Sequence, residues 1–216
     1  ARISYLREIH GEYKGAIEAM DMAVTAGMPG YEQTAWCRLT LGKLHENYGD
    51  LEQAKMQYQI LLSERPEYPF AYAGLSRVEM KNGNLNKSME LLDKAISLIP
   101  EVGFYMQKAE LHAAMGDQDK ANALYPEILA MMKEDSDAGH NMDLEVGLVH
   151  LDLGNKADKA LEYIEKAAKG REANIEINAA YAATYLEMGD LANAEAHINK
   201  AMATNTRNTE YLGVAG

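Results

Sequence analysis

A glycine followed by an acidic residue or an asparagine recurs six times along the chain, at intervals of 33 to 38 residues. Each copy follows a segment whose apolar residues have helical spacing. The six glycines are Gly11, Gly49, Gly83, Gly116, Gly154 and Gly189. A period of this length is typical of architectures that stack one small unit many times, and it argues against a single central core.

Small residues keep a fixed distance from these glycines on both sides. Seven residues before each glycine stand Ser4, Gly42, Ser76, Ala109, Gly147 and Ala182. Five residues after it, or six in the copy at Gly154, stand Ala16, Ala54, Ser88, Ala121, Ala160 and Ala194. Small residues on facing sides let two helices approach closely. The glycine can end one helix in the left-handed conformation, and the Asp or Asn after it can cap the next. The pattern therefore predicts helical hairpins that bury their apolar faces against their neighbours.

This pattern resembles the tetratricopeptide repeat, which runs Leu-Gly, then Tyr, Ala, Phe and Pro. The copy that matches best consists of Leu41, Gly42, Gly49, Asp50, Ala54, Tyr58 and Pro66. The resemblance implies an all-α fold, a right-handed α-solenoid of antiparallel helix-turn-helix repeats. It also implies that the first helices of the hairpins line a concave side, where extended peptides or partner helices bind.

We expect a single solenoid over residues 1–216. Its repeats are predicted at 1–30 (partial), 34–67, 68–101, 102–134, 139–171 and 174–207, with the start of a seventh at 208–216. The stretches 2–7, 34–36 and 141–145 also look like a bacterial subgroup of multi-repeat proteins without an assigned activity. Because Ala1 is not an initiator methionine and the last residues read as an element cut short, we expect a fragment of a longer chain. Residues 134–140 are expected to form an acidic, flexible connection.

Charge and hydropathy exclude several classes of partner. The formal net charge is −12 and no basic patch stands out, so nucleic acid and anionic membrane surfaces are poor partners. No run of 18 apolar residues occurs, which predicts no membrane insertion. Cys37 is the only cysteine and cannot form an internal disulfide. The compartment stays open between cytoplasmic and secreted or periplasmic.

Sequence motifs for catalysis are missing. Neither a glycine-rich phosphate-binding motif nor His-Glu-x-x-His occurs, and Cys37 has no base positioned beside it. His45, His112 and His150 share one repeat position, four residues before the turn glycine. Equivalent positions in adjacent hairpins lie about 9–10 Å apart or more, too far to ligate one metal. We therefore predict no enzyme, no cofactor and no metal, and histidines that are half-buried with one ring nitrogen bonded to a neighbouring helix.

One stripe along the predicted first helices marks a candidate partner-binding groove. Its residues are Trp36, Leu39, Lys43, Asn47, Phe70, Arg77, Lys81 and Glu110. The aromatic and basic members form the one cationic-aromatic cluster on an acidic chain. Such a cluster could bind an acidic side chain or a C-terminal carboxylate, with the aromatic rings as apolar anchors. The alternative is that the aromatic rings pack between helices and the basic side chains are solvated.

The function predicted from these features is a protein–protein interaction scaffold that presents a concave groove to a peptide or a partner helix. The identity of that partner is not predicted. Two alternatives stay open. The array could be the substrate-recognition arm of a larger enzyme, or it could be a self-assembling structural module. Self-association is suggested because both ends lack polar capping helices and expose apolar faces.

Overall fold

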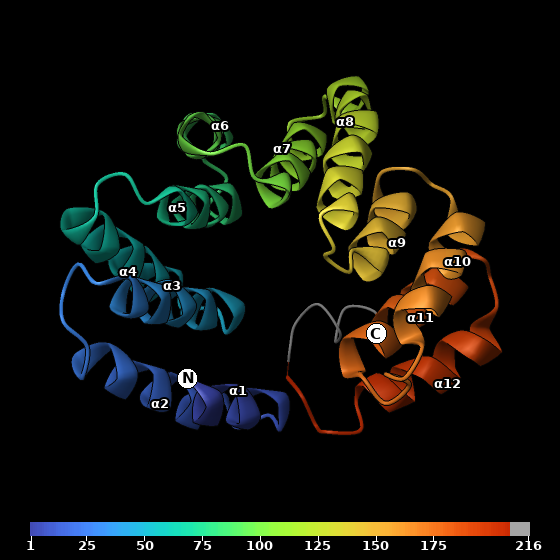
Figure 1. Cartoon of the computed structure of the whole chain (residues 1–216), viewed down its shortest axis with the longest axis horizontal. Helices are drawn as coiled ribbons and strands as arrows, with labels where there is room; N and C mark the ends of the chain where they lie inside the picture. The colour runs from blue at the N-terminus through green and yellow to red at the C-terminus, as the bar shows by residue number, and fades with distance from the viewer. Residues whose placement is uncertain (208–216) are drawn as a thin grey trace. The chain divides into compact units, whose positions relative to one another are not determined.

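The structure, a computed structural model, describes residues 1–207 and contains only α-helices as regular elements in that range. In chain order the helices are α1 (Arg2–Ile9), α2 (Tyr13–Thr25), α3 (Glu32–Asn47), α4 (Leu51–Glu64), α5 (Pro69–Lys81), α6 (Leu85–Leu98), α7 (Val102–Ala114), α8 (Gln118–Asp137), α9 (Asp143–Asp152), α10 (Ala157–Ala168), α11 (Ile175–Glu187) and α12 (Leu191–Ala201). Figure 1 shows them following one another along the chain, with antiparallel pairs such as α3 with α4 and α11 with α12. The predicted all-α class is confirmed. The repeat start predicted at 208–216 lies outside the described residues.

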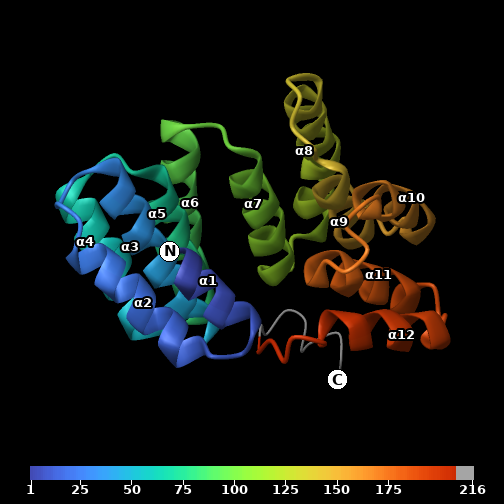
Figure 2. The same cartoon turned by 60° about the horizontal axis from the view of Figure 1, so that its bottom comes forward.

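The chain divides into two compact units. The first, Ala1–Met115, holds α1 to α7, and the second, Gly116–Asn205, holds α8 to α12. In the first unit α1 packs on α2, α3 on α4 and α5 on α6, while α2 also packs on α3 and α4 on α5. In the second unit α9 packs on α10 and α11 on α12, with α10 against α11 (Figure 2). Each hairpin thus buries its apolar face against the next hairpin in its unit.

The small residues at the two repeat positions are all buried, as predicted. Where serine occupies both positions, the hydroxyls bridge the pair, because Ser88 Oγ donates to the Ser76 carbonyl at 2.8 Å. In α1, Ser4 Oγ donates to the Ala16 carbonyl on α2, also at 2.8 Å. These bonds satisfy buried hydroxyls at points where the helices are too close for larger side chains.

The turn between the helices of a hairpin follows the prediction in five of six copies. Five glycines have φ between 75° and 85°, namely Gly11, Gly49, Gly83, Gly116 and Gly189. Asp50 and Asp190 cap the next helix, each accepting a backbone N–H at 3.1 Å. The predicted caps at Asn84 and Asp117 are wrong, since neither side chain caps its helix. At Gly154 the prediction is also wrong, because the inserted residue moves the left-handed position to Asn155, with φ 48°.

The core of the second and third hairpins is built around the ring of Tyr58, which is fully buried on α4. A Cβ atom at Gly42 on α3 would lie 2.4 Å from the ring, and one at Gly74 on α5 would lie 2.6 Å from it. Real Cβ atoms do not approach other atoms so closely, so both positions require glycine while the tyrosine is present. One ring therefore sets the spacing of three helices.

Helix α8 is longer than the sequence pattern predicts. It continues past Pro126 to Asp137, so the expected flexible connection at 134–140 is helical over its first four residues. Lys133 forms an ion pair with Asp137 one turn later, which supports helix in an acidic segment. The helix ends before Gly139, whose φ of 98° favours glycine.

Candidate functional site

The candidate site is a face of the first unit formed by α3 and α5, which lie side by side. Residues separated by three, four or seven positions share one face of a helix. This spacing brings Trp36, Lys43 and Glu46 to one face of α3 and Arg77 and Lys81 to one face of α5. We refer to these five residues as the α3/α5 face.

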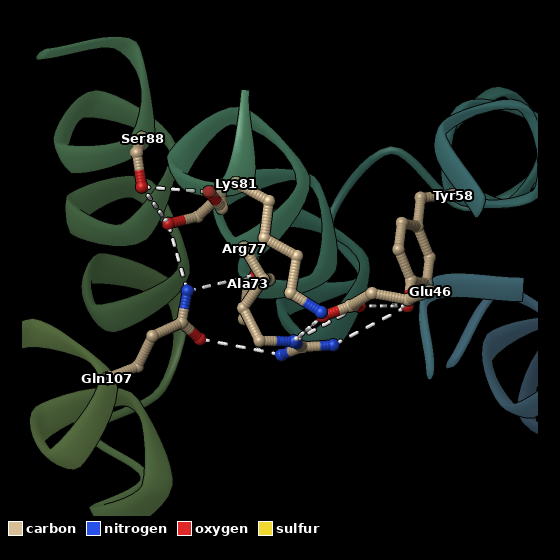
Figure 3. A network of polar contacts seen from close by, with 8 residues as sticks. Glu46, Tyr58, Ala73, Arg77, Lys81, Ser88 and Gln107 are labelled. Carbon is tan, nitrogen blue, oxygen red and sulfur yellow. Dashed lines mark hydrogen bonds and ion pairs between the residues drawn. The ribbon is translucent and has the colours of Figure 1, made fainter. Parts of the chain in front are cut away.

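A buried carboxylate joins the two helices of the α3/α5 face (Figure 3). Glu46 Oε1 lies 3.0 Å from Nε of Arg77 and 3.1 Å from Nζ of Lys81. The hydroxyl of Tyr58 donates to Glu46 Oε2 at 3.0 Å. Only 4% of the Glu46 side chain is exposed, whereas 26% of Arg77 and 42% of Lys81 is exposed. The carboxylate is therefore held inside the protein by cations that reach the surface.

The charges around Glu46 determine the protonation states of Glu46 and Tyr58. Burial alone would raise the pKa of the Glu46 carboxyl, but Arg77 and then Lys81 outweigh burial and hold that pKa below its usual value. Burial raises the pKa of the Tyr58 hydroxyl far above its usual value, so Tyr58 stays protonated and donates to the carboxylate. At neutral pH Glu46 is therefore charged and neutralises part of the cationic cluster.

Gln107 on α7 extends the network to a third helix (Figure 3). Its Nε2 donates to the Ala73 carbonyl at 3.1 Å and to Ser76 Oγ at 2.9 Å. Its Oε1 accepts from Nη1 of Arg77 at 3.4 Å. Because both ends of the buried amide have partners, Gln107 fixes the position of α7 against α5.

Lys43 is the one basic residue of the α3/α5 face that makes no hydrogen bond or ion pair with any part of residues 1–207. Its side chain is exposed. Nevertheless, surrounding protein desolvates the ammonium and, with the charge of Arg77, lowers the pKa of Lys43, against the opposing effects of Glu46 and Glu101. Lys43 is thus a cation without a bonded partner among the described residues, although the charges of Glu46 and Glu101 act on it through space.

The aromatic residues of the predicted groove have different environments. Trp36 is 45% exposed and borders an apolar hollow of about 500 Å³ with Tyr5 and Leu6 of α1. Phe70 is half-buried and packs edge-on against Phe104, with ring centroids 5.4 Å apart. Trp36 is therefore available to a ligand, while Phe70 mainly contributes to the packing of α5 against α7.

The remaining predicted groove residues divide between core and surface. Leu39 is 6% exposed and belongs to the core cluster around Tyr58. Asn47 is half-buried and its side chain hydrogen-bonds to Glu8, a contact that opposes the upward effect of burial on the pKa of that acid. Glu110 is exposed on α7. Arg77 and Lys81 thus meet at Glu46, and the charges of Arg77 and Glu46 act on Lys43. Trp36 lies two turns away on α3, beside α1, and Leu39 belongs to the core.

Sequence reasoning missed Glu46 and Gln107, the two residues that hold the cluster together. The only sequence signal for Glu46 was its position three residues after Lys43, on the same helical face. Its partner Arg77 lies 31 residues further along the chain. Gln107 had no such signal, since its contacts lie 30 or more residues away.

The histidines at the shared repeat position do not converge. Nδ1 of His150 lies 2.7 Å from the Tyr125 hydroxyl on α8, so this ring nitrogen bonds to a neighbouring helix as predicted. The prediction of a half-buried ring is wrong here, because His150 is only 6% exposed. His45 is half-buried, and burial lowers its pKa. Among residues 1–207 no group of three or more His, Cys, Asp or Glu side chains is arranged to hold a metal ion. No helix in the same range combines the length and the apolar character needed to cross a bilayer.

Comparisons with known proteins agree with this geometry. A family model described as tetratricopeptide repeat matches residues 71–102. Among solved structures the chain is similar to TTC0263, a protein with such repeats from Thermus thermophilus, with 26% identity and a TM-score of 0.62 over 84% of this chain and 97% of that one. Among curated proteins no sequence matches this chain.

Two further solved structures share the fold at lower identity. A tetratricopeptide repeat protein from Parabacteroides merdae is 16% identical, with a TM-score of 0.54 over 98% of this chain and 81% of that one. PilW, described as a type IV pilus biogenesis factor, is 16% identical, with a TM-score of 0.52 over 86% of this chain and 89% of that one. At this identity the likeness concerns the fold alone.

Proposed function

We propose that the chain, whose residues 71–102 match the tetratricopeptide repeat, works as a protein-interaction scaffold and that its α3/α5 face binds an extended peptide. The observation that carries the proposal is Lys43, an exposed cation on a chain of net charge −12 that makes no hydrogen bond or ion pair with any described residue. A peptide carboxylate would supply the missing partner through a charge-assisted hydrogen bond. The binding would need little ordering of the receptor, because both helices are already fixed by their hairpins.

The second contact of the proposed peptide is apolar. Trp36 lies seven residues before Lys43, which is about 10 Å along the helix axis. An extended peptide covers that distance with about three residues. We therefore propose a ligand that carries an apolar side chain in the hollow at Trp36 and an acidic side chain three residues away at Lys43. Arg77 and Lys81 are assigned a supporting role, since Glu46 already occupies both of them.

The test uses synthetic peptides in which leucine and glutamate are three residues apart, followed by fluorescence anisotropy. The Lys43→Glu variant should bind such a peptide roughly tenfold more weakly, because an attraction becomes a repulsion. The matched control is Lys94→Glu on α6, where the side chain is exposed and makes no ion pair with any described residue. Replacing glutamate by glutamine in the peptide should abolish the difference between wild type and Lys43→Glu. Equal binding by the Lys43 and Lys94 variants would contradict the assignment.

Self-association is a second candidate function, and one feature favours it. Ile3, Tyr5 and Leu6 on α1 are 63%, 61% and 54% exposed, which places three large apolar side chains on one short helix. Exposed apolar patches commonly mark surfaces that contact other proteins. Light scattering of the protein at several concentrations, compared with a Leu6→Glu variant, tests this. A mass that rises with concentration only in the wild type supports self-association, and a constant monomer mass in both proteins contradicts it.

A further inference from the structure

The second unit contains a hollow of about 410 Å³ that is separate from the α3/α5 face. It is lined by residues of α8, α9 and α10 and by Met142 just before α9, and it opens to solvent. A volume of this size lies within the usual range for sites that bind small molecules or single side chains. One part of its wall is apolar and consists of Leu129, Met132, Met142 and Val146. The polar part includes His150, Lys159, Tyr163 and Lys166.

A chain of hydrogen bonds orients the imidazole of His150 in this wall. Nζ of Lys156 donates to the Tyr125 hydroxyl at 3.2 Å. That hydroxyl lies 2.7 Å from Nδ1 of His150. A lysine ammonium can only donate, so the hydroxyl accepts from Lys156 and uses its own proton to donate to Nδ1. In the neutral imidazole the remaining proton is therefore on Nε2, which makes no hydrogen bond within residues 1–207.

The imidazole of His150 is neutral, and the charged groups nearest to it are mainly lysines. Burial lowers the pKa of His150, and the charges of Lys159 and Lys156 lower it further, against a weaker opposing effect of Glu162. Nζ of Lys166 lies 4.1 Å from the centroid of the Tyr163 ring, and that ring packs on His150 with centroids 5.3 Å apart. The imidazole therefore keeps an N–H donor on Nε2, close enough to the ammonium groups of Lys159 and Lys156 for their charges to act on it.

Two acidic residues also line the hollow, and neither forms an ion pair with Lys159 or Lys166 in the described part of the chain. Glu162 stands one turn from both Lys159 and Lys166 on α10, so one carboxylate faces two ammonium groups, and it forms no ion pair with either in the described part of the chain. Asp143 lies in the first turn of α9, where the helix dipole already favours a negative charge. The lysines at 159 and 166 are thus left without a bonded anion.

From this arrangement we propose that the hollow between α8, α9 and α10 binds a carboxylate that carries an apolar group. The carboxylate accepts from Nε2 of His150 and from the ammonium groups of Lys159 and Lys166. The apolar group lies against Met132 and Val146 and their neighbours, where it is removed from water. Two sources have this chemistry, namely a small aliphatic acid and the C-terminal residue of a peptide that ends in an apolar side chain. The proposal does not depend on binding at the α3/α5 face.

The experiment follows the ring signals of ¹³C-labelled histidine by NMR during titration at neutral pH. The probes are octanoate and an N-acetylated pentapeptide that ends in leucine, and the controls are octanamide and the same peptide with a C-terminal amide. The His150 signal is identified by its loss in a His150→Gln variant. We expect at least one carboxylate probe to shift this signal saturably at millimolar concentration. Its amide should bind roughly tenfold more weakly, because the charge-assisted bonds are lost.

Charge variants locate the site. Lys159→Gln and Lys166→Gln should each weaken binding of the carboxylate roughly three- to tenfold, as expected for removing one partly exposed charge partner. Lys200→Gln on α12 is the matched control, because Lys200 is exposed and does not line the hollow. Response to octanoate alone identifies a small acid as the ligand class, and response to the peptide identifies a C-terminus. Equal binding of acid and amide, loss of affinity in the Lys200 variant alone, or a His150 signal that no probe moves would each overturn the proposal.

Discussion

Glu46 on α3 accepts a hydrogen bond from Nε of Arg77 on α5 at 3.0 Å, so an ion pair with a buried carboxylate joins two consecutive hairpins. Glu46→Gln should lower the free energy of unfolding by about 2–3 kcal/mol, because it leaves Arg77 and Lys81 without their counter-charge in a partly buried place. Urea denaturation followed by circular dichroism measures this loss.

The double variant Glu46→Gln/Arg77→Met separates the ion pair from other effects of the substitutions. If the pair itself stabilises the protein, the two changes together should cost less than the sum of the single changes, by about 1–2 kcal/mol. Lys87→Gln offers a comparison, since its ion pair with Glu90 is exposed on α6 and its loss should be within about 0.5 kcal/mol. Additive effects at Glu46 and Arg77 would show that the pair contributes nothing of its own.

Acid should destabilise the first unit through the same carboxylate. The folded protein holds the pKa of Glu46 below its ordinary value of 4.5, with Arg77 as the main cause once burial has been overcome. A depressed pKa means that the unfolded chain binds the proton more readily, so the stabilisation is complete above pH 4.5 and is lost as the pH falls through the folded pKa. The urea midpoint of the wild type should therefore fall more steeply between about pH 5 and pH 3 than that of Glu46→Gln. Parallel pH profiles for the two proteins would contradict this role.

Alanine at Gly74 should destabilise the protein, although alanine normally favours a helix. A Cβ at this position would lie 2.6 Å from the Tyr58 ring, which is fully buried and cannot move aside. We expect a loss of about 1–3 kcal/mol. Gly15 in α2 is the matched control, because its Cβ would meet only the flexible end of Arg7, at 3.1 Å. Gly15→Ala should be neutral or gain up to about 1 kcal/mol, and thermal unfolding distinguishes the two results.

Alanine substitutions at Leu39 and Trp36 should affect different properties, the first mainly stability and the second mainly peptide binding. Leu39→Ala should cost about 2–4 kcal/mol of unfolding free energy, because Leu39 lies in the core around Tyr58. Trp36→Ala should change stability by less than about 1 kcal/mol, since the ring is 45% exposed, but it should weaken binding of the leucine–glutamate peptides. Unfolding measurements and anisotropy on both variants check the assignment. A large stability loss for Trp36→Ala would mean that the ring is structural.

The hairpins could be predicted from the sequence because their determinants are local. A left-handed glycine such as Gly49, and the cap at Asp50, depend on residues within one turn, and the small residues face each other at a constant spacing. The same reasoning failed at Gly154, where one inserted residue gives the left-handed conformation to Asn155. A local sequence pattern predicts a turn correctly only when the alignment of the repeats is correct to within one residue.

The candidate site could be predicted only in part, because its charges are balanced by residues from other helices. Helical spacing grouped Trp36 and Lys43, and steps of three residues placed Leu39 and Glu46 at the edge of the same face, where both side chains are buried. The pairing of Arg77 with Glu46 spans 31 residues, and spacing along one helix carries no information about it. The same holds for His150 and Tyr125, which are 25 residues apart.

The ring of Tyr58 between Gly42 and Gly74 has a consequence for how this protein can change over time. A smaller side chain at position 58 would leave a void between α3 and α5, and a larger one at either glycine would collide with the ring. No single substitution at these positions is neutral, so we expect the three positions to covary among related sequences. A relative that has exchanged one of them is expected to have exchanged at least one of the others as well.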